Sequence, residues 1–221
     1  VIIWSGAIDR YRIKISFLRK FLRKLIVKKT DRFIVYGTKA KEYIYNLGAP
    51  KEKIFISFNT VDIRSYPTKN FYQCQKSKIN ILFVGYLTKG KNIESIFPLV
   101  KKISKNYSIE LTIVGDGPNR KSLEDQTKIL DLVNLVSFEG YKQKNELSKY
   151  YTNADIFLFP SNYDIWGLVL VEAMAHSLVC ISSIHAGATS DLIVEGITGF
   201  SVDFSDLNDL EKKVINLIND R

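Results

Sequence analysis

Residues 159–176 read FPSNYDIWGLVLVEAMAH, a run that combines the end of a strand, a polar loop and the start of a helix. The apolar residues 154–159 are stopped by Pro160, which cannot continue a central strand. Gly167 then opens a segment that is apolar nearly all round, which is typical of a helix packed between a sheet and other structure. Glu172 lies in the middle of that segment. Because a buried carboxylate is costly unless it is paired or hydrogen-bonded, Glu172 needs either a protein cation or a ligand hydroxyl.

Asp164 and Glu172 are candidate ligand-binding carboxylates. Asp164 lies in the loop before the expected helix, and Glu172 lies about one and a half turns into it. The free N–H groups of Gly167, Leu168 and Val169 would suit a phosphate, and Gly167 lets a ligand approach closely. A purely structural interpretation is equally open, with Asp164 as a helix cap and Glu172 as half of a buried salt bridge.

The run resembles the E-x7-E signature of retaining GT-B glycosyltransferases of family 4, which usually reads P-S-x-x-E-G-F-G-L-V-x-x-E-A-M-A. Pro160 and Ser161 match its start, and residues 166–169 and 172–175 correspond to the rest. Asp164 stands in place of the first glutamate and keeps the charge on a shorter arm. The resemblance implies that Glu172 binds the ribose hydroxyls of a nucleotide and that Asp164 lies near the donor sugar.

Loops elsewhere in the chain resemble the same family. Residues 84–92, VGYLTKGKN, are similar to its V-G-R-L-x-x-x-K-G, whose arginine and lysine grip the donor diphosphate. Lys91 matches the lysine, whereas Tyr86, which follows Gly85, replaces the arginine and removes one cation. Residues 115–118, GDGP, match a turn of the family, and Gly140 and Tyr141 lie in a stretch that resembles the family's segment whose backbone frames the base. Without the resemblance, Lys91 reads as a surface lysine, the commonest situation for this residue type.

Strand and helix patterns alternate along most of the chain. After Ile79, strands are expected near residues 80–85, 110–114, 134–138, 155–159, 179–182 and 199–202, with helices near 93–104, 120–130, 144–151, 167–176 and 207–218. Such alternation predicts a Rossmann-like α/β fold, a parallel sheet with helices on both faces and ligands beyond the carboxyl ends of the strands. Earlier strands are expected near 1–4, 31–36 and 53–57, the first of them as the end of a buried strand, with Thr38 capping a helix that runs to about Asn46. We therefore expect residues 1–63 to be the trailing part of an N-terminal GT-B domain, 64–78 a linker and 79–221 the nucleotide-sugar-binding domain.

The net charge of +9 is concentrated near the N-terminus, because nine basic residues and no acidic one lie between Arg10 and Lys29. Apolar residues recur there at helical spacing, which predicts an amphipathic helix from about Ile8 to Lys29. This helix could pack on a sheet and leave a solvated basic face, or it could lie on anionic lipid. Nucleic acid is the weakest of the three alternatives, since no nucleic-acid motif accompanies the charge.

Several function classes are excluded or disfavoured by composition. No apolar run approaches the roughly 18 to 20 residues that span a bilayer. Cys74 and Cys180 fit no metal or redox spacing and are read as ordinary thiols of a cytoplasmic protein. His176 is expected to end a helix and His185 to lie near the site, but two histidines are too few for a metal cluster. The chain begins at Val1 without a methionine, which suggests a fragment.

Taken with the resemblance, these features predict a retaining glycosyltransferase that needs no metal or cofactor and uses a nucleotide-diphosphate sugar as co-substrate. The expected acceptor is a glycan, a lipid-linked sugar or a similar molecule in cell-surface polysaccharide or glycolipid synthesis, at or near the inner face of the membrane. Asp164 and Lys91 are the expected catalytic residues, and the chain alone is expected to bind nucleotide without turnover. The alternatives are a nucleotide-sugar epimerase on the same fold and a non-catalytic nucleotide-binding module. A dinucleotide dehydrogenase is disfavoured, since no G-x-G-x-x-G follows a first strand.

Overall fold

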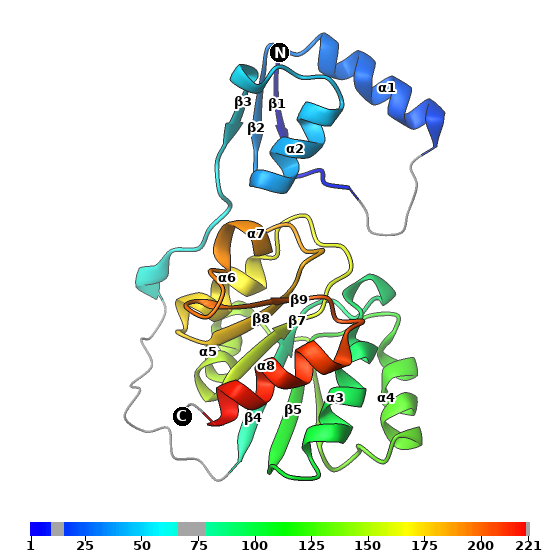
Figure 1. The fold of residues 1–221 in the computed structure, drawn as a ribbon, viewed down its shortest axis with the longest axis vertical. Coiled ribbons are helices and arrows are strands. Elements are labelled where there is room, and N and C mark those ends of the chain that lie inside the picture. The colour runs from blue at the N-terminus through cyan, green and yellow to red at the C-terminus, as the bar shows by residue number, and fades with distance from the viewer. Residues whose placement is uncertain (10–15, 66–77, 220–221) are drawn as a thin grey trace.

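The computed structural model describes residues 1–9, 16–65 and 78–219, which form two parallel sheets (Figure 1). The smaller sheet has the strand order β1-β2-β3, and the larger one has the order β6-β5-β4-β7-β8-β9. The pairings between neighbouring strands are parallel in both sheets. The expected fold class is therefore confirmed: a Rossmann-like α/β unit accompanied by a smaller α/β unit.

Helices and strands alternate in both units. The small unit, residues 1–65 as described, contains β1 (Ile2–Ser5), α1 (Phe17–Lys28), β2 (Arg32–Val35), α2 (Thr38–Asn46) and β3 (Ile54–Ile56). The strands of the large unit are β4 (Ile79–Val84), β5 (Ile109–Val114), β6 (Val136–Gly140), β7 (Ile156–Phe159), β8 (Val179–Ser183) and β9 (Gly199–Val202). Its helices are α3 (Ile96–Ile103), α4 (Arg120–Ile129), α5 (Lys144–Asn153), α6 (Leu168–Ala175), α7 (Thr189–Leu192) and α8 (Leu207–Asn219). The strands predicted from the sequence match these bounds to within about two residues, in line with the precision expected of such predictions.

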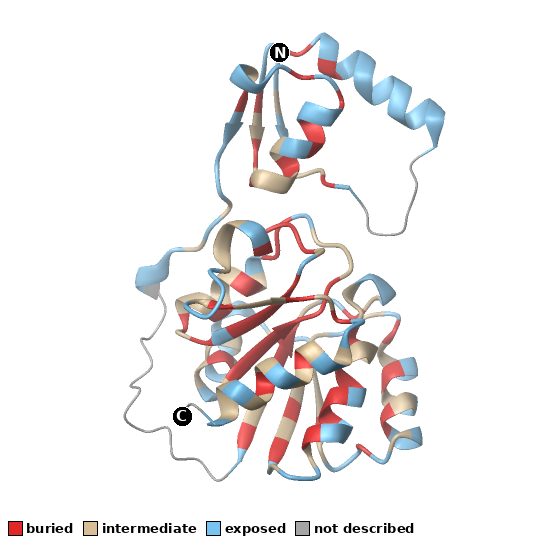
Figure 2. Ribbon diagram, in the orientation of Figure 1, coloured by how far each residue is buried: buried red, intermediate tan, exposed pale blue. Residues whose placement is uncertain are grey.

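The large sheet is buried on both faces, as a parallel sheet requires. Along β4, Ile81 and Phe83 face a core that includes residues of α3, α4 and α8, whereas Leu82 and Val84 face a core that includes residues of α5 and α6. This alternation follows from the two-residue period of a strand. Figure 2 shows the buried residues running through the strands of this sheet.

The strand order of the large sheet reverses between β4 and β7. The chain moves outward in one direction through β4, β5 and β6, and then returns to build β7, β8 and β9 on the other side of β4. In sheets of this kind, the loops at the carboxyl ends of the strands on either side of the reversal form a crevice that binds ligands. Here they are the loops that follow β4 and β7, and they contain Lys91 and Asp164.

The small unit buries one side of its sheet. Phe33 and Val35 of β2 pack with Tyr43 and Ile44 of α2 in its core. Strand β1 forms where the sequence predicts it, but the expectation that it is buried is wrong, because Ile2 and Trp4 are both 67% exposed. Among the described residues β1 is an edge strand paired only with β2.

The basic helix differs from its prediction in length and in orientation. Helix α1 begins at Phe17 and not near Ile8, which is buried outside any helix; the predicted residues 10–15 lie outside the described part of the chain. Its apolar stripe is exposed, with exposed fractions of 42–86%, and consists of Phe17, Leu18, Phe21, Leu22, Leu25 and Ile26. Val27, the buried residue of α1, lies on the opposite side of the helix from this stripe. The interpretation in which α1 packs its apolar face on the sheet is therefore wrong for the described structure (Figure 2).

The two units meet at the N-terminal end of α2. Thr38 does not cap this helix: the cap position is Gly37, and the backbone N–H of Thr38 donates a hydrogen bond of 2.9 Å to the carboxylate of Asp191 in α7. The Thr38 hydroxyl also donates to Asp191, and the Lys39 ammonium donates to the carbonyl oxygen of Ala186 at 2.9 Å. Burial at this interface lowers the pKa of Lys39. Most of the predicted linker, residues 66–77, lies outside the described residues.

Candidate functional site

Residues 159–176 form the end of a strand, a tight loop and a helix. Strand β7 is buried along its length, and the loop after it ends at Gly167, whose φ of 97° is a conformation that glycine adopts at little cost. A Cβ at Gly167 would lie 2.6 Å from the ring of Phe159. The loop therefore turns directly against the end of β7, and α6 begins at Leu168 with its first N–H groups at the strand ends.

The two residues predicted to be catalytic lie together. The Lys91 ammonium forms an ion pair with the Asp164 carboxylate, and both side chains are largely buried. Lys91 sits in a short turn after β4, and its ammonium also lies 5.7 Å from the centre of the Phe159 ring. The other carboxylate oxygen of Asp164 accepts a hydrogen bond of 3.4 Å from the backbone N–H of Trp166. A cation and a carboxylate thus meet next to the N-terminus of α6, where the backbone also favours anions.

Glu172 has a partner that the sequence did not indicate. Its carboxylate accepts a hydrogen bond of 2.9 Å from the hydroxyl of Tyr151 in α5. Within the described residues no lysine or arginine forms an ion pair with Glu172, so the buried salt bridge considered above is not formed there. The Tyr151 ring in turn stacks on His176 at 4.9 Å between ring centres, and His176 ends α6 as expected. Tyr151 gave no sequence signal, because a tyrosine in a helix is usually read as a packing residue.

An apolar cavity of about 420 Å³ opens at the carboxyl ends of β4 and β5. Gly85, Tyr86 and Tyr141 line it together with Val84, Val114, Gly115, Asp116, Lys142 and Leu147. The loops around it touch closely, since a Cβ at Gly115 would lie 1.9 Å from the carbonyl oxygen of Gly85. Gly140, which precedes Tyr141, accepts a hydrogen bond of 2.9 Å from the Gly115 N–H. Tyr86 and Tyr141 are 64% and 69% exposed, so their rings are free to cover a flat ligand.

The predicted site residues therefore fall into three neighbouring groups. Lys91, Asp164 and the first residues of α6 lie at the reversal of strand order, and the residues of the glycine- and tyrosine-containing loops line the apolar cavity. Glu172 lies on α6 against α5. Within the described ranges, no group of three or more His, Cys, Asp or Glu side chains could hold a metal ion.

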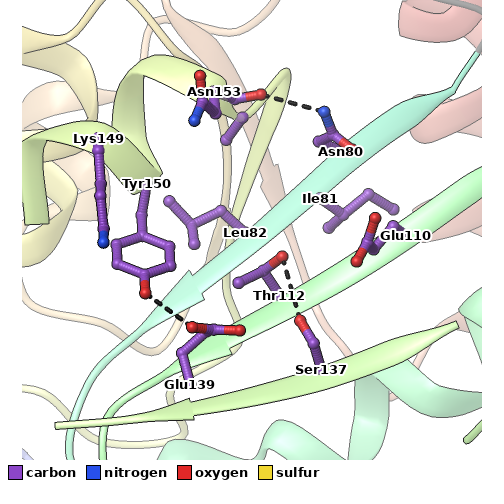
Figure 3. Close-up of a pocket in the computed structure, with 11 residues that line it drawn as sticks. Asn80, Ile81, Leu82, Glu110, Thr112, Ser137, Glu139, Lys149, Tyr150 and Asn153 are labelled. Atoms are coloured by element: carbon purple, nitrogen blue, oxygen red, sulfur yellow. Dashed lines mark hydrogen bonds between the residues drawn. The ribbon is translucent and has the colours of Figure 1, made fainter. Parts of the chain in front are cut away.

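A second cavity, of about 350 Å³, lies on the face of β4, β5 and β6 beside α5 (Figure 3). Its polar lining is hydrogen-bonded within itself: the Tyr150 hydroxyl donates to Glu139 at 2.7 Å, and Ser137 donates to Thr112 at 3.4 Å. It contains none of the predicted site residues. We interpret it as the part of this sheet face that α5 leaves uncovered.

A doubly wound parallel sheet with a cation, a carboxylate and a helix N-terminus at its strand-order reversal defines a Rossmann-like α/β protein with its ligand crevice at that reversal. Residues 67–221 match the family described as "Glycosyl transferases group 1", and the chain belongs to this family. Across the described residues, no helix combines the length and apolar character needed to cross a membrane.

Relatives and solved structures agree with this assignment. An uncharacterized 41.2 kDa protein in the cps region of Klebsiella pneumoniae is 28% identical over 194 residues, which cover 85% of this chain and 52% of that protein. The capsular polysaccharide biosynthesis glycosyltransferase CapM of Staphylococcus aureus is 29% identical over 153 residues, covering 69% of this chain and 40% of CapM. The structure of Anabaena HepE in complex with UDP superposes with a TM-score of 0.83 at 17% identity, over 99% of this chain and 62% of HepE. The chain spans about half the length of the curated relatives it matches.

Proposed function

We propose that the large unit binds a nucleotide-diphosphate sugar and that the protein transfers the sugar to an acceptor with retention of configuration. The observation that carries this proposal is the meeting of Lys91 and Asp164 at the reversal of strand order, beside the N-terminus of α6. Family membership supports the reaction class. We also propose that residues 1–63 are the trailing part of an N-terminal GT-B domain, that residues 64–78 are a linker, and that residues 79–221 are the nucleotide-sugar-binding domain.

The proposed chemistry rests on charge. When the bond between the sugar and the diphosphate breaks, negative charge grows on the leaving phosphate, and positive charge grows on the sugar. Lys91 and the N–H groups of Gly167, Leu168 and Val169 would stabilise the leaving diphosphate. Asp164 would stabilise the positive sugar. Donors fixed by the fold cost little reorganisation during the reaction, which is the advantage of placing them at a helix terminus.

The Lys91–Asp164 ion pair has a consequence for donor binding. In the described structure Asp164 already neutralises the cation that the diphosphate would use. The diphosphate therefore competes with Asp164 for Lys91, and part of its attraction is spent on separating the pair. Once the pair is separated, Asp164 is available to the sugar.

The nucleoside would occupy the apolar cavity. Its exposed Tyr86 and Tyr141 rings offer flat surfaces to a base, and the backbone around Gly85 and Gly140 permits close approach. Tyr86 stands where the family has an arginine, so we assign it to packing and not to phosphate binding. Glu172 would accept ribose hydroxyls with the carboxylate that Tyr151 orients.

For the acceptor we infer a glycan or a lipid-linked sugar used in cell-surface polysaccharide or glycolipid synthesis. The name of the Staphylococcus aureus relative supports polysaccharide synthesis. We infer a cytoplasmic site of action, because nucleotide sugars are the proposed donors.

Helix α1 would bring the protein to an anionic membrane surface. Its apolar stripe is exposed, and the helix also carries Arg19, Lys20, Arg23, Lys24 and Lys28 without an acidic residue. Apolar residues can enter the boundary of the bilayer while basic residues meet anionic headgroups. A lipid-linked acceptor would be found at the same surface.

The first test is a thermal-shift screen of the 221-residue chain with UDP-, GDP- and ADP-sugars, with the free sugars as controls. A ligand that binds only the folded state raises its melting temperature, so one nucleotide sugar should shift the midpoint and the free sugar should not. Donor hydrolysis or transfer should then be measured with and without acceptor. Interconversion of the donor into a different nucleotide sugar without acceptor would instead support an epimerase. Absence of any shift would contradict the donor proposal.

A further inference from the structure

Trp166 lies in the loop between β7 and α6, which also contains Asp164 and is called the donor loop below. Its side chain contacts the small unit. It is 3% exposed, and its indole N–H donates a hydrogen bond of 2.6 Å to the carbonyl oxygen of Asn59. The indole also stacks on Phe58, with 5.6 Å between ring centres and 25° between ring planes. Gly37 approaches it from the start of α2, where a Cβ would lie 2.4 Å from the indole ring. The indole is therefore enclosed by the small unit on several sides.

The backbone of the same residue belongs to the proposed donor site. The Trp166 N–H donates to the Asp164 carboxylate at 3.4 Å, and the Trp166 carbonyl accepts from the N–H of Ala188 at 3.1 Å. The next residue, Gly167, begins the turn into α6. A shift of the indole would therefore move both Asp164 and the first N–H groups of α6.

Other contacts hold the loop from within the large unit. The N–H of Asn162 donates to the Gly90 carbonyl at 3.0 Å, and the N–H of Gly187 donates to the Asp164 carbonyl at 2.9 Å. These bonds fix the first half of the loop and its middle. The end of the loop, immediately before α6, is where the small unit contributes through Trp166.

We propose that Trp166 is a positioning residue that sets the phosphate- and sugar-binding end of the site according to how the small unit is docked. The inference rests on the proposed function and deepens it. It assigns control of that site to Trp166, which is not among the residues proposed to contact the donor. The indole N–H bond holds the loop end, and the loop end holds Asp164 and the α6 N–H groups. Docking of the small unit and phosphate binding are thus coupled through one side chain.

The chain offers a matched control, because it contains two tryptophans. Trp4 is 67% exposed on β1 and its ring contacts Tyr36 edge-on, so Trp4→Phe makes the same chemical change at a tryptophan that lies mostly in solvent. Trp166→Phe keeps an aromatic ring for Phe58 and removes the indole N–H. The experiment measures binding of UDP and of uridine to the unaltered 221-residue chain and to both variants, at a temperature where all are folded.

We expect Trp4→Phe to bind both ligands as the unaltered chain does. Trp166→Phe should bind UDP about two- to tenfold more weakly, as expected for the loss of one neutral hydrogen bond, and should bind uridine unchanged. In the Trp4→Phe chain Trp166 is the remaining tryptophan, and its emission should respond to UDP but not to uridine. A purely structural role would weaken both ligands alike or neither.

Several results would overturn the inference. They are equal UDP affinity in Trp166→Phe and the unaltered chain, a parallel loss for uridine, or Trp166 emission that is indifferent to saturating UDP. If Trp166→Phe does not fold, Phe58→Leu serves in its place, since Phe58 is 54% exposed and contacts the same indole. Failure of the unaltered chain to bind UDP, GDP or ADP would overturn the proposed function as well, and so the two failures are distinguishable.

Discussion

The two units of the chain use their apolar residues differently. The large unit buries apolar side chains on both faces of its sheet, and the apolar helix α6 packs in the same core cluster as α5 on one of these faces. The small unit leaves Ile2 and Trp4 of β1 and the apolar stripe of α1 exposed. Helices α1 and α6 thus contain seven apolar residues each, which form an open surface in α1 and part of a packed scaffold in α6. The difference separates residues that support the proposed donor site from residues that are available for another surface.

Matched leucine substitutions test this difference between the two units most directly. Leu158 of β7 is fully buried, whereas Leu22 of α1 is 50% exposed. Leu158→Ala should lower the free energy of unfolding by about 2 to 5 kcal/mol, because it removes packed atoms and leaves a cavity. Leu22→Ala should change it by no more than about 0.5 kcal/mol. Denaturant midpoints measure both, and equal losses would show that the stripe of α1 is packed in solution.

Substitution of Glu172 tests whether this carboxylate in the large unit binds ribose. A carboxylate that accepts ribose hydroxyls makes charge-assisted hydrogen bonds of about 1.5 to 3 kcal/mol each. Glu172→Gln should therefore weaken UDP and uridine by tenfold or more while the protein stays folded. Tyr151→Phe is the control, because it removes the hydroxyl that orients Glu172 but leaves the charge, and it should have a smaller effect. A large loss of stability with unchanged affinity would assign Glu172 a structural role.

Substitution of Lys91 should weaken binding of the phosphate groups and leave binding of the nucleoside unchanged. Lys91→Ala removes the cation that the diphosphate would contact, so UDP should bind about tenfold more weakly, as expected for one charged hydrogen bond. Uridine affinity should not change. Lys89→Ala, in the same short turn, is the control. Equal losses of UDP and uridine affinity in Lys91→Ala would contradict the assignment.

Substitution of Asp164 should change UDP affinity in the opposite direction to substitution of Lys91. Asp164→Asn removes the carboxylate that competes for Lys91, so UDP should bind more tightly, by about two- to fivefold, which corresponds to less than about 1 kcal/mol. Sugar transfer by the active protein should fall in the same variant. Isothermal titration measures the affinity, and weaker UDP binding would show that Asp164 does not oppose the diphosphate.

The last effect concerns the exposed stripe of α1 and the basic residues of that helix. Lys24→Glu in α1 should weaken binding to vesicles of phosphatidylglycerol and phosphatidylcholine, at about 1 kcal/mol per basic residue near the surface. Lys121→Glu, an exposed lysine of α4, makes the same change in the large unit and should have little effect. Binding should also weaken with salt because screening increases. Indifference to the phosphatidylglycerol content would remove the membrane proposal.

Much of the large unit could be predicted from the sequence, because its strands are short apolar runs separated by helical periodicity. The rule that ligands bind at carboxyl strand ends was sufficient to bring Lys91 and Asp164 to one edge of the sheet. Their ion pair could not be predicted, since it depends on side-chain conformations across 73 residues of chain. The hydrogen bond from Tyr151 to Glu172 could not be predicted either, because only the packing of α5 against α6 brings these residues together.

The small unit shows what periodicity does not determine. The spacing of Leu18, Leu22 and Leu25 correctly predicted that they share one side of a helix. It did not determine what covers that side, and the expectation of packing on the sheet was wrong. In the same way Thr38 looked like a helix cap, because Ser and Thr favour that position. The group that caps α2 lies about 150 residues further along the chain, in α7, where no local pattern could reveal it.

The borrowed cap of α2 links the unfolding of the two units. An α-helix carries a macrodipole whose N-terminal end is stabilised by negative charge, and Gly37 at the cap position has no side chain to provide it. Asp191 in α7 of the large unit supplies both the charge and the hydrogen-bond acceptor. Helix α2 is then most stable only while α7 is folded against it. Amide hydrogen exchange in the first turn of α2 should therefore follow the opening of the α7 segment, so that the two sheets behave as one cooperative unit at this point.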